Sequence, residues 1–176
     1  MEILFFFSSF VASSQKCISE IIEWNILIYF FILFSCEPDD ICLESYDDTP
    51  KLIVRFYDEI TNELKPLRNL EIISTETQDT LFFNEVDSIP IPLNHKENFT
   101  SLSIKINSYS TDANIDNILI DYTKKPIYIS VGCGFVLNFN INSFIIEKDQ
   151  NNWIKNYNIY KSIIENEETR HIEVFH

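Results

Sequence analysis

The feature that most constrains this chain is a repeated alternation of apolar and polar residues over short segments. In residues 51–57, Leu52, Val54 and Phe56 fall on one side of an extended chain, and Arg55 and Tyr57 fall on the other. Successive side chains of a strand point to opposite faces of a sheet, so this pattern is typical of a strand with one buried face. The same alternation predicts further strands at residues 69–74, 80–83, 99–107, 115–122 and 170–176.

Two other segments carry special strand signals. Residues 88–93 contain Pro90 and Pro92, which cannot donate to a ladder, so this piece is predicted to be an edge strand or an extended loop. In residues 127–141 every odd-numbered position is apolar, and the even-numbered positions are mostly polar or small. This alternation predicts one long strand central to the core. The two glycines of the chain, Gly132 and Gly134, predict a bend or bulge in that strand.

Residues 153–164 fit both a helical and a strand spacing, and their aromatic and β-branched content favours a strand. About eight short strands, with no dependable helix, predict an all-β domain at residues 50–176. The expected architecture is an immunoglobulin-like or related antiparallel β-sandwich. An N-terminal hydrophobic segment, compatible with a helix, precedes it.

That hydrophobic segment ends in a pattern that looks like a bacterial lipobox. Residues 26–35 carry no charge, which suits a signal peptide and is too short for a bilayer span of about 20 residues. Leu33 stands at −3 and Ser35 at −1 from Cys36. Residues 1–35 are therefore expected to be removed, and Cys36 to carry the lipid. An uncleaved membrane anchor is the alternative. The missing basic start predicts that the first 22 or so residues are an upstream extension.

Residues 36–49 form an expected acidic tether. Glu37, Asp39 and Asp40 follow the lipobox cysteine directly and resemble the surface-export signal of Bacteroidetes-type lipoproteins. A solvated tether explains the same residues equally well. A calcium site is a third interpretation, although the regular ligand spacing and turn glycine of a calcium loop are missing.

If the lipobox is correct, each of the four cysteines can be assigned a role. Cys17 leaves with the signal and Cys36 carries lipid, so Cys42 and Cys133 remain. An oxidising envelope compartment favours a disulfide between them. Two buried free thiols are the alternative, and the scattered cysteines and histidines lack the close ligand pairs of a zinc site.

The charge and the chemistry-bearing residues narrow the function. Without residues 1–35 the chain keeps 24 acidic and 12 basic residues, a formal charge of −12, which disfavours nucleic acid and anionic lipid headgroups as partners. His95 and His171 are the candidates for a hydrolase, but the sequence contains no Gly-x-Ser-x-Gly elbow. Tyr128, Trp153 or the acidic tether would serve a carbohydrate- or calcium-binding module. The preferred prediction is a non-enzymatic binding or structural module without catalytic residues, metal or cofactor, whose envelope protein partner is unknown.

Several stretches together resemble a family. They are 36–42 with its two cysteines, Thr49–Asp58, Asp87–Leu93, Val131–Phe135 and the terminal 165–175. The combination looks like the uncharacterised small-lipoprotein family of Bacteroidetes. The resemblance implies a cell-envelope location, in the outer membrane facing the periplasm or the cell surface, and it supports pairing Cys42 with Cys133. It implies no known activity.

Overall fold

The computed structural model describes residue 42 and residues 48–176. The predicted lipobox residues Leu33, Ser35 and Cys36 lie outside the described residues, as do the predicted export-signal residues Glu37, Asp39 and Asp40. The chain divides into two compact units, residues 1–42 and 43–176. All strands described below belong to the second unit.

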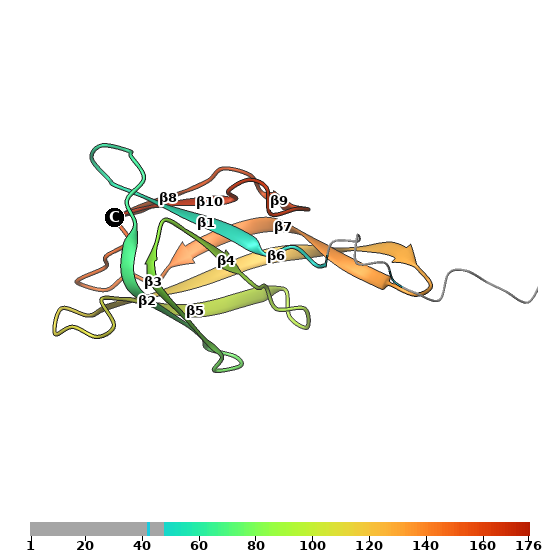
Figure 1. The fold of residues 1–176 in the computed structure, drawn as a ribbon, viewed down its shortest axis with the longest axis horizontal. Helices are drawn as coiled ribbons and strands as arrows, with labels where there is room; N and C mark the ends of the chain where they lie inside the picture. The colour runs from blue at the N-terminus through green and yellow to red at the C-terminus, as the bar shows by residue number, and fades with distance from the viewer. Residues whose placement is uncertain (1–41, 43–47) are drawn as a thin grey trace, which may run out of the picture. The chain divides into compact units, whose positions relative to one another are not determined.

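Ten strands in the described part of the chain form two sheets (Figure 1). Sheet A has four strands, in the order β4 (Ser88–Ile91), β1 (Leu52–Tyr57), β10 (Ile172–Phe175) and β8 (Asn156–Ile159). Sheet B has six, in the order β3 (Thr80–Val86), β2 (Leu67–Ser74), β5 (Phe99–Ile106), β6 (Asn114–Ser130), β7 (Gly134–Ile146) and β9 (Ile163–Ile164).

Neighbouring strands are antiparallel with one exception. β1 and β10 run parallel, with Val54 opposite Ile172 and Phe56 opposite Val174. Since β1 comes first among the strands and β10 last, this pair joins the two ends of the domain at the centre of sheet A. The position of β4 at one edge of that sheet confirms the edge placement predicted from Pro90.

One hydrophobic core lies between the sheets. Leu52, Val54 and Phe56 of β1 are buried, as their alternation predicted, and they share a cluster with Ile72 of β2 and Ile120 of β6. Each buried aliphatic or aromatic side chain of this kind contributes about 1.5–3 kcal/mol to folding. The all-β sandwich class predicted from the sequence is therefore confirmed, with ten strands in place of about eight.

The predicted single strand at 127–141 is wrong. β6 continues to Ser130, the chain turns through 131–133, and β7 returns from Gly134, whose φ of +72° is a left-handed conformation that suits glycine. The odd-numbered positions stay apolar through the turn, so the sequence pattern looks like one strand although the chain forms two. We call residues 126–137 the hairpin arm.

The arm also departs from the predicted role at the centre of the core. Phe139 and Ile141 of β7 are buried, whereas Val131 and Phe135 are 73% and 67% exposed. The strands of sheet A are only four to six residues long, so they cover part of β6 and β7 and leave the arm uncovered. In Figure 1 the arm, formed by the ends of β6 and β7, extends beyond the other strands.

The segment at 153–164 is extended, as predicted, but it is not one strand. β8 joins sheet A and β9 joins sheet B. Between them the chain crosses from one sheet to the other, and the backbone N–H of Ile141 donates to the carbonyl of Ser162 at 2.8 Å. Pattern alone could not show this crossing, because both pieces alternate with the same residue types.

Candidate functional site

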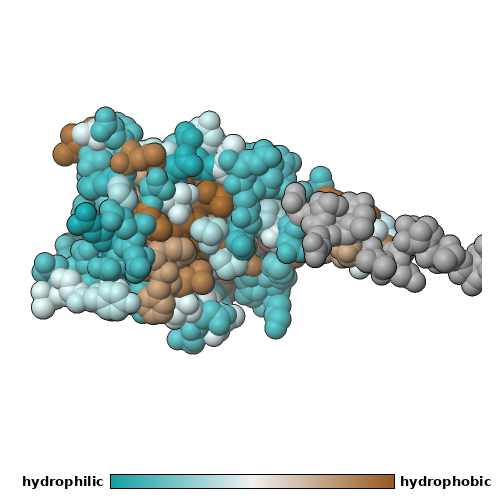
Figure 2. Space-filling model, viewed as in Figure 1, coloured by the Kyte–Doolittle hydropathy of each residue, from teal (hydrophilic) through white to brown (hydrophobic). Residues whose placement is uncertain are grey.

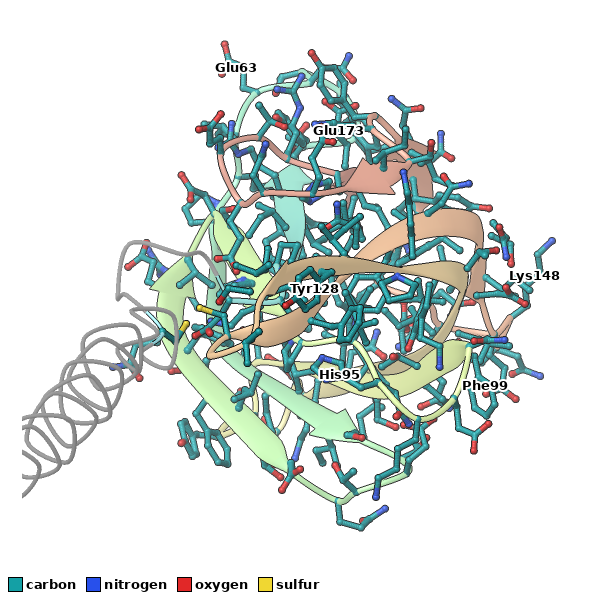
Figure 3. The ribbon with its side chains drawn as sticks, turned by 90° about the vertical axis from the view of Figure 1, so that its right-hand side faces the viewer. Glu63, His95, Phe99, Tyr128, Lys148 and Glu173 are labelled. Atoms are coloured by element: carbon teal, nitrogen blue, oxygen red, sulfur yellow. The ribbon has the colours of Figure 1, made fainter. Side chains whose placement is uncertain are left out.

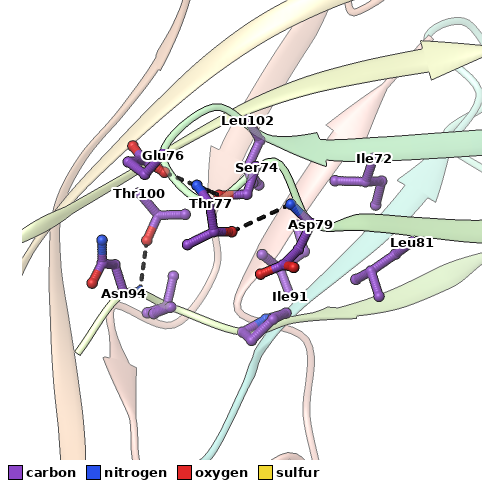
Figure 4. Close-up of a pocket in the computed structure, with 12 residues that line it drawn as sticks. Ile72, Ser74, Glu76, Thr77, Asp79, Leu81, Ile91, Asn94, Thr100 and Leu102 are labelled. Atoms are coloured by element: carbon purple, nitrogen blue, oxygen red, sulfur yellow. Dashed lines mark hydrogen bonds between the residues drawn. The ribbon is translucent and has the colours of Figure 1, made fainter. Parts of the chain in front are cut away.

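A pocket lies between the edge strands of the two sheets, and we call it the edge pocket (Figure 4). It has a volume of about 220 Å³. Its walls are mostly apolar, and the space-filling view shows hydrophobic surface gathered over β3 and β4 on an otherwise largely hydrophilic face (Figure 2). The lining residues are Ile72, Ser74, Glu76, Thr77, Asp79, Leu81, Ile91, Pro92, Leu93, Asn94, Thr100 and Leu102.

A hydrogen-bonded turn between β2 and β3 forms one side of the edge pocket. The carboxylate of Glu76 accepts hydrogen bonds from the backbone N–H of Ser101 at 2.9 Å and from the hydroxyl of Ser74 at 3.2 Å. The backbone N–H of Ser74 donates to the carbonyl of Asp79 at 2.9 Å. Gln78 takes the left-handed φ of 62° that closes the turn. These bonds fix the carboxylate of Glu76 and the backbone of Asp79 beside the pocket.

The opposite side of the pocket is fastened by a buried tyrosine. The hydroxyl of Tyr122 donates to the carbonyl of Asn94 at 2.8 Å and bonds the hydroxyl of Thr100, also at 2.8 Å. The backbone N–H of Asn94 donates to Thr100 Oγ1 at 2.9 Å, which closes a three-residue network. Burial raises the pKa of Tyr122, so its hydroxyl stays protonated and keeps donating.

Lys124 extends this network along the loop that follows β4. Its ammonium donates to the carbonyls of His95, Lys96 and Glu97 at 3.0, 3.1 and 3.2 Å. Three carbonyl dipoles around one cation fix the loop next to the edge pocket. Neither Tyr122 nor Lys124 was predicted from the sequence to have this role. A signal for Tyr122 was present in the sequence, because it occupies an inward position of a strand whose other inward residues are mostly aliphatic. A buried tyrosine hydroxyl needs a hydrogen-bond partner.

The chemistry of the edge pocket is that of a small binding site. Apolar walls from Ile72, Leu81 and Leu102 suit a hydrocarbon body, and the carboxylates of Glu76 and Asp79 suit a hydroxyl or cationic group. Both oxygens of Glu76 already accept protein hydrogen bonds, so Asp79 carries the more available carboxylate.

The histidines proposed for a hydrolase lie in separate places. His95 belongs to the loop after β4, and its ring stands 6.2 Å from that of Phe139. His171 is fully buried beside β1, where its Nδ1 accepts from the backbone N–H of Ile53 at 3.0 Å. Burial lowers the pKa of His171, so the neutral ring serves as a hydrogen-bond acceptor for the backbone. Figure 3 shows where His95 lies relative to Tyr128.

The residues proposed for carbohydrate stacking are also apart. Trp153 is buried, and its indole Nε1 donates to the carbonyl of Ile104 at 3.2 Å. Tyr128 lies on the exposed hairpin arm and contacts Phe135. Trp153 belongs to the core and Tyr128 to the exposed arm, so the two rings do not form one stacking surface. Among residues 42 and 48–176, no cluster of three or more acidic, cysteine or histidine side chains has the arrangement of a metal site.

Both members of the predicted cysteine pair, Cys42 and Cys133, are disulfide-bonded in the structure. Free thiols at these positions are thereby excluded. Cys133 lies in the turn of the hairpin arm, with its backbone N–H donating to Ser130 Oγ at 3.1 Å. At the base of the arm, the backbone N–H of Leu137 donates to Thr49 Oγ1 at 3.1 Å. Thr49 thus brings the start of the described domain alongside β7.

Comparison with known protein families identifies a family for this chain. Residues 69–176 match the model of DUF6452, which is described as a family of unknown function. No curated protein and no solved structure gives a significant match. In the part of the chain described by the structure, no helix has the length and hydropathy needed to cross a membrane. Because the family model covers more than half of the sequence, from β2 to the last strand, this chain belongs to the DUF6452 family of unknown function.

Proposed function

We propose that this chain is a lipid-anchored lipoprotein of the bacterial cell envelope, held in the outer membrane through a lipid on Cys36. In this proposal residues 1–35 are a signal peptide, residues 36–49 a tether and residues 50–176 the working domain. The bacterium is a member of the Bacteroidetes. Leu33, Ser35 and Cys36 provide the recognition pattern for lipid attachment.

The observation that carries this proposal is the disulfide state of Cys42 and Cys133. Disulfides persist in the periplasm and at cell surfaces and are rare in the cytosol. We infer that the two cysteines pair with each other, because they are the two that remain once Cys17 and Cys36 are assigned to the signal peptide and the lipid. An exported, oxidised domain is what a lipoprotein signal would deliver.

We further propose that the domain is a non-enzymatic binding or structural module whose partner is another envelope component. Support comes from the use of its histidines and its aromatic residues. His171 accepts a backbone hydrogen bond in the core, and Trp153 donates one to Ile104. These side chains are committed to the fold, so a hydrolase built on them would have to break those bonds.

Intact-mass measurement on protein extracted from membranes of its own host tests the anchor and the bridge together. The expected mass is that of residues 36–176 with two or three acyl chains, and it should rise by two hydrogens on reduction. An unlipidated full-length mass would contradict the anchor. A mass unchanged by reductant would contradict the paired cysteines.

The edge pocket favours a second candidate, a module that binds a small ligand with an apolar body and hydroxyl groups. A panel of methyl glycosides can be titrated while amide NMR signals of Thr77, Asp79 and Asn94 are followed. Binding should shift these signals, and Leu81→Trp, which fills the pocket, should abolish the shifts. Shifts that survive Leu81→Trp would place the ligand elsewhere.

A further inference from the structure

The hairpin arm presents an uncharged apolar surface on a strongly acidic chain. Tyr128, Val131 and Phe135 are 55%, 73% and 67% exposed. Residues 126–137 contain no Asp, Glu, Lys or Arg, although the chain has a formal net charge of −14. Exposed apolar side chains that cluster in this way mark a contact surface. We propose that the tip of the arm inserts into the lipid surface to which Cys36 is attached, a step that rests on the anchor proposed above.

The arm holds its aromatic side chains in a defined arrangement. Tyr128 on β6 faces Phe135 on β7 in the ladder, and their rings meet edge to face with centroids 5.2 Å apart. Figure 3 views the domain from the arm end, with Tyr128 labelled on it. Tyrosine and other amphipathic aromatic side chains concentrate at the membrane–water boundary.

The tether places the arm near the proposed membrane. The hydrogen bond from Leu137 to Thr49 fixes the end of the tether at the base of the arm. Residues 36–49 reach at most about 45 Å when fully extended. Pairing of Cys42 with Cys133 would shorten this, because the six-residue step from Cys36 to Cys42 spans at most about 20 Å. The turn of the arm would then stay close to the acyl chains.

The backbone limits how deeply the arm inserts. The ladder between β5 and β6 ends at Asp121, and β9 pairs only with Phe139 and Asn140 of β7. Apart from the bond to Thr49, the outer edges of the arm have no ladder partner among the described strands. Unpaired backbone groups are not tolerated in hydrocarbon, so the arm enters only the headgroup boundary, to a depth of about 5–10 Å.

A lipid surface suits the arm better than a protein surface does. Protein interfaces surround an apolar centre with a polar rim, and arginine is enriched in them. The arm has no charged side chain over its full length, and its apolar residues lie on both strands and in the turn. Contact with another protein, or with a second copy of this chain, is therefore treated as an alternative outcome of the experiment.

A tryptophan reporter at the arm tests the proposal. The chain extracted from its own host is reconstituted into zwitterionic phosphatidylethanolamine–phosphatidylcholine vesicles whose acyl chains carry bromine near the headgroup, a quencher of tryptophan emission. Phe135→Trp should show blue-shifted emission that is quenched by the brominated lipid. The matched control is Phe82→Trp on β3, because Phe82 is 58% exposed on the edge strand farthest from β7 in the sheet order. Wild-type protein supplies the background from the native tryptophans.

Intact mass of the same samples separates the two proposals. Acylated protein with an unquenched Phe135→Trp would overturn the insertion and leave the anchor standing. Unacylated protein with a quenched Phe135→Trp would overturn the anchor and support lipid contact by the arm. A blue shift without quenching would overturn lipid contact in favour of a protein contact. Adding Val131→Asp, which places a charge in the turn, should abolish the quenching.

Discussion

The carboxylate of Asp116 accepts a hydrogen bond of 2.8 Å from the backbone N–H of Ile154, and a second, of 3.2 Å, from that of Trp153. Asp116 is buried on β6, and the two donors precede β8 in the other sheet. One side chain therefore ties the connection into sheet A onto sheet B. Burial raises the pKa of Asp116, partly offset by these bonds.

Replacing Asp116 with alanine should therefore destabilise the fold. The change leaves two buried backbone donors without an acceptor, and we expect a loss of about 2–4 kcal/mol in the free energy of unfolding. Urea unfolding followed by far-ultraviolet circular dichroism would measure it. Asp112→Ala, at an exposed acidic position, is the control and should change stability by less than about 0.5 kcal/mol. Equal losses of unfolding free energy for both variants would contradict the proposed role of Asp116 in joining the two sheets.

Acid should destabilise the protein through His171. Burial lowers the pKa of His171 in the folded state, so below pH 6.5 the unfolded chain takes up a proton that the folded chain does not. The neutral ring thus contributes stability that is complete above pH 6.5 and decreases as the pH falls toward the lowered folded-state value.

His171→Asn isolates this effect, because an asparagine oxygen can replace Nδ1 as the acceptor for Ile53. Urea midpoints at pH 8, 6.5 and 5 should fall more steeply for wild type than for His171→Asn. His176, whose pKa is also lowered by burial, is present in both proteins and cancels in the comparison. Parallel pH profiles would rule out His171 as the source of acid sensitivity.

Tyr122→Phe should loosen the loop beside the edge pocket. The change removes the hydroxyl that bonds Thr100 and Asn94, and we expect a loss of about 1–2 kcal/mol. Hydrogen exchange at residues 94–98 should become faster in the variant. Tyr109→Phe, at an exposed position, should change neither quantity. Unchanged exchange in Tyr122→Phe would show that Lys124 alone holds the loop.

Cys42→Ser and Cys133→Ser should each cost the same stability as the double variant, if the two residues pair with each other. Closing a loop of about 90 residues is worth roughly 4–5 kcal/mol by chain entropy. Thermal unfolding of oxidised protein would report the loss for each variant. Additive losses from the two single variants would mean that each cysteine is bonded elsewhere.

The alternation of apolar residues predicted the core strands well, because burial on one face enforces a period of two. Leu52, Val54 and Phe56 are buried as expected, and so are Ile172 and Val174. The predicted boundaries at residues 74 and 80 also agree with the end of β2 and the start of β3. Which face of a strand is buried and where a strand ends depend on residues that are close together in the sequence, so short segments are enough to predict them.

The same alternation misled the prediction at 127–141, since it reports which face a side chain takes and not whether anything covers that face. Val131 and Phe135 have the parity of Phe139, yet the short strands of sheet A end before reaching them. The edge pocket was missed for a related reason. Asp79 and Asn94 meet only because β3 and β4 form the neighbouring edges of two sheets, which is a tertiary relationship.

The parallel pairing of β1 with β10 has a consequence for the order of events during synthesis. The central ladder of sheet A contains the first and the last strand, so it cannot form until residues 172–175 have left the ribosome. Contacts between such distant parts of a chain also slow folding. While the chain is still being synthesised, β1 can pair with β4 but not with β10, so sheet A stays incomplete until the last described strand is made.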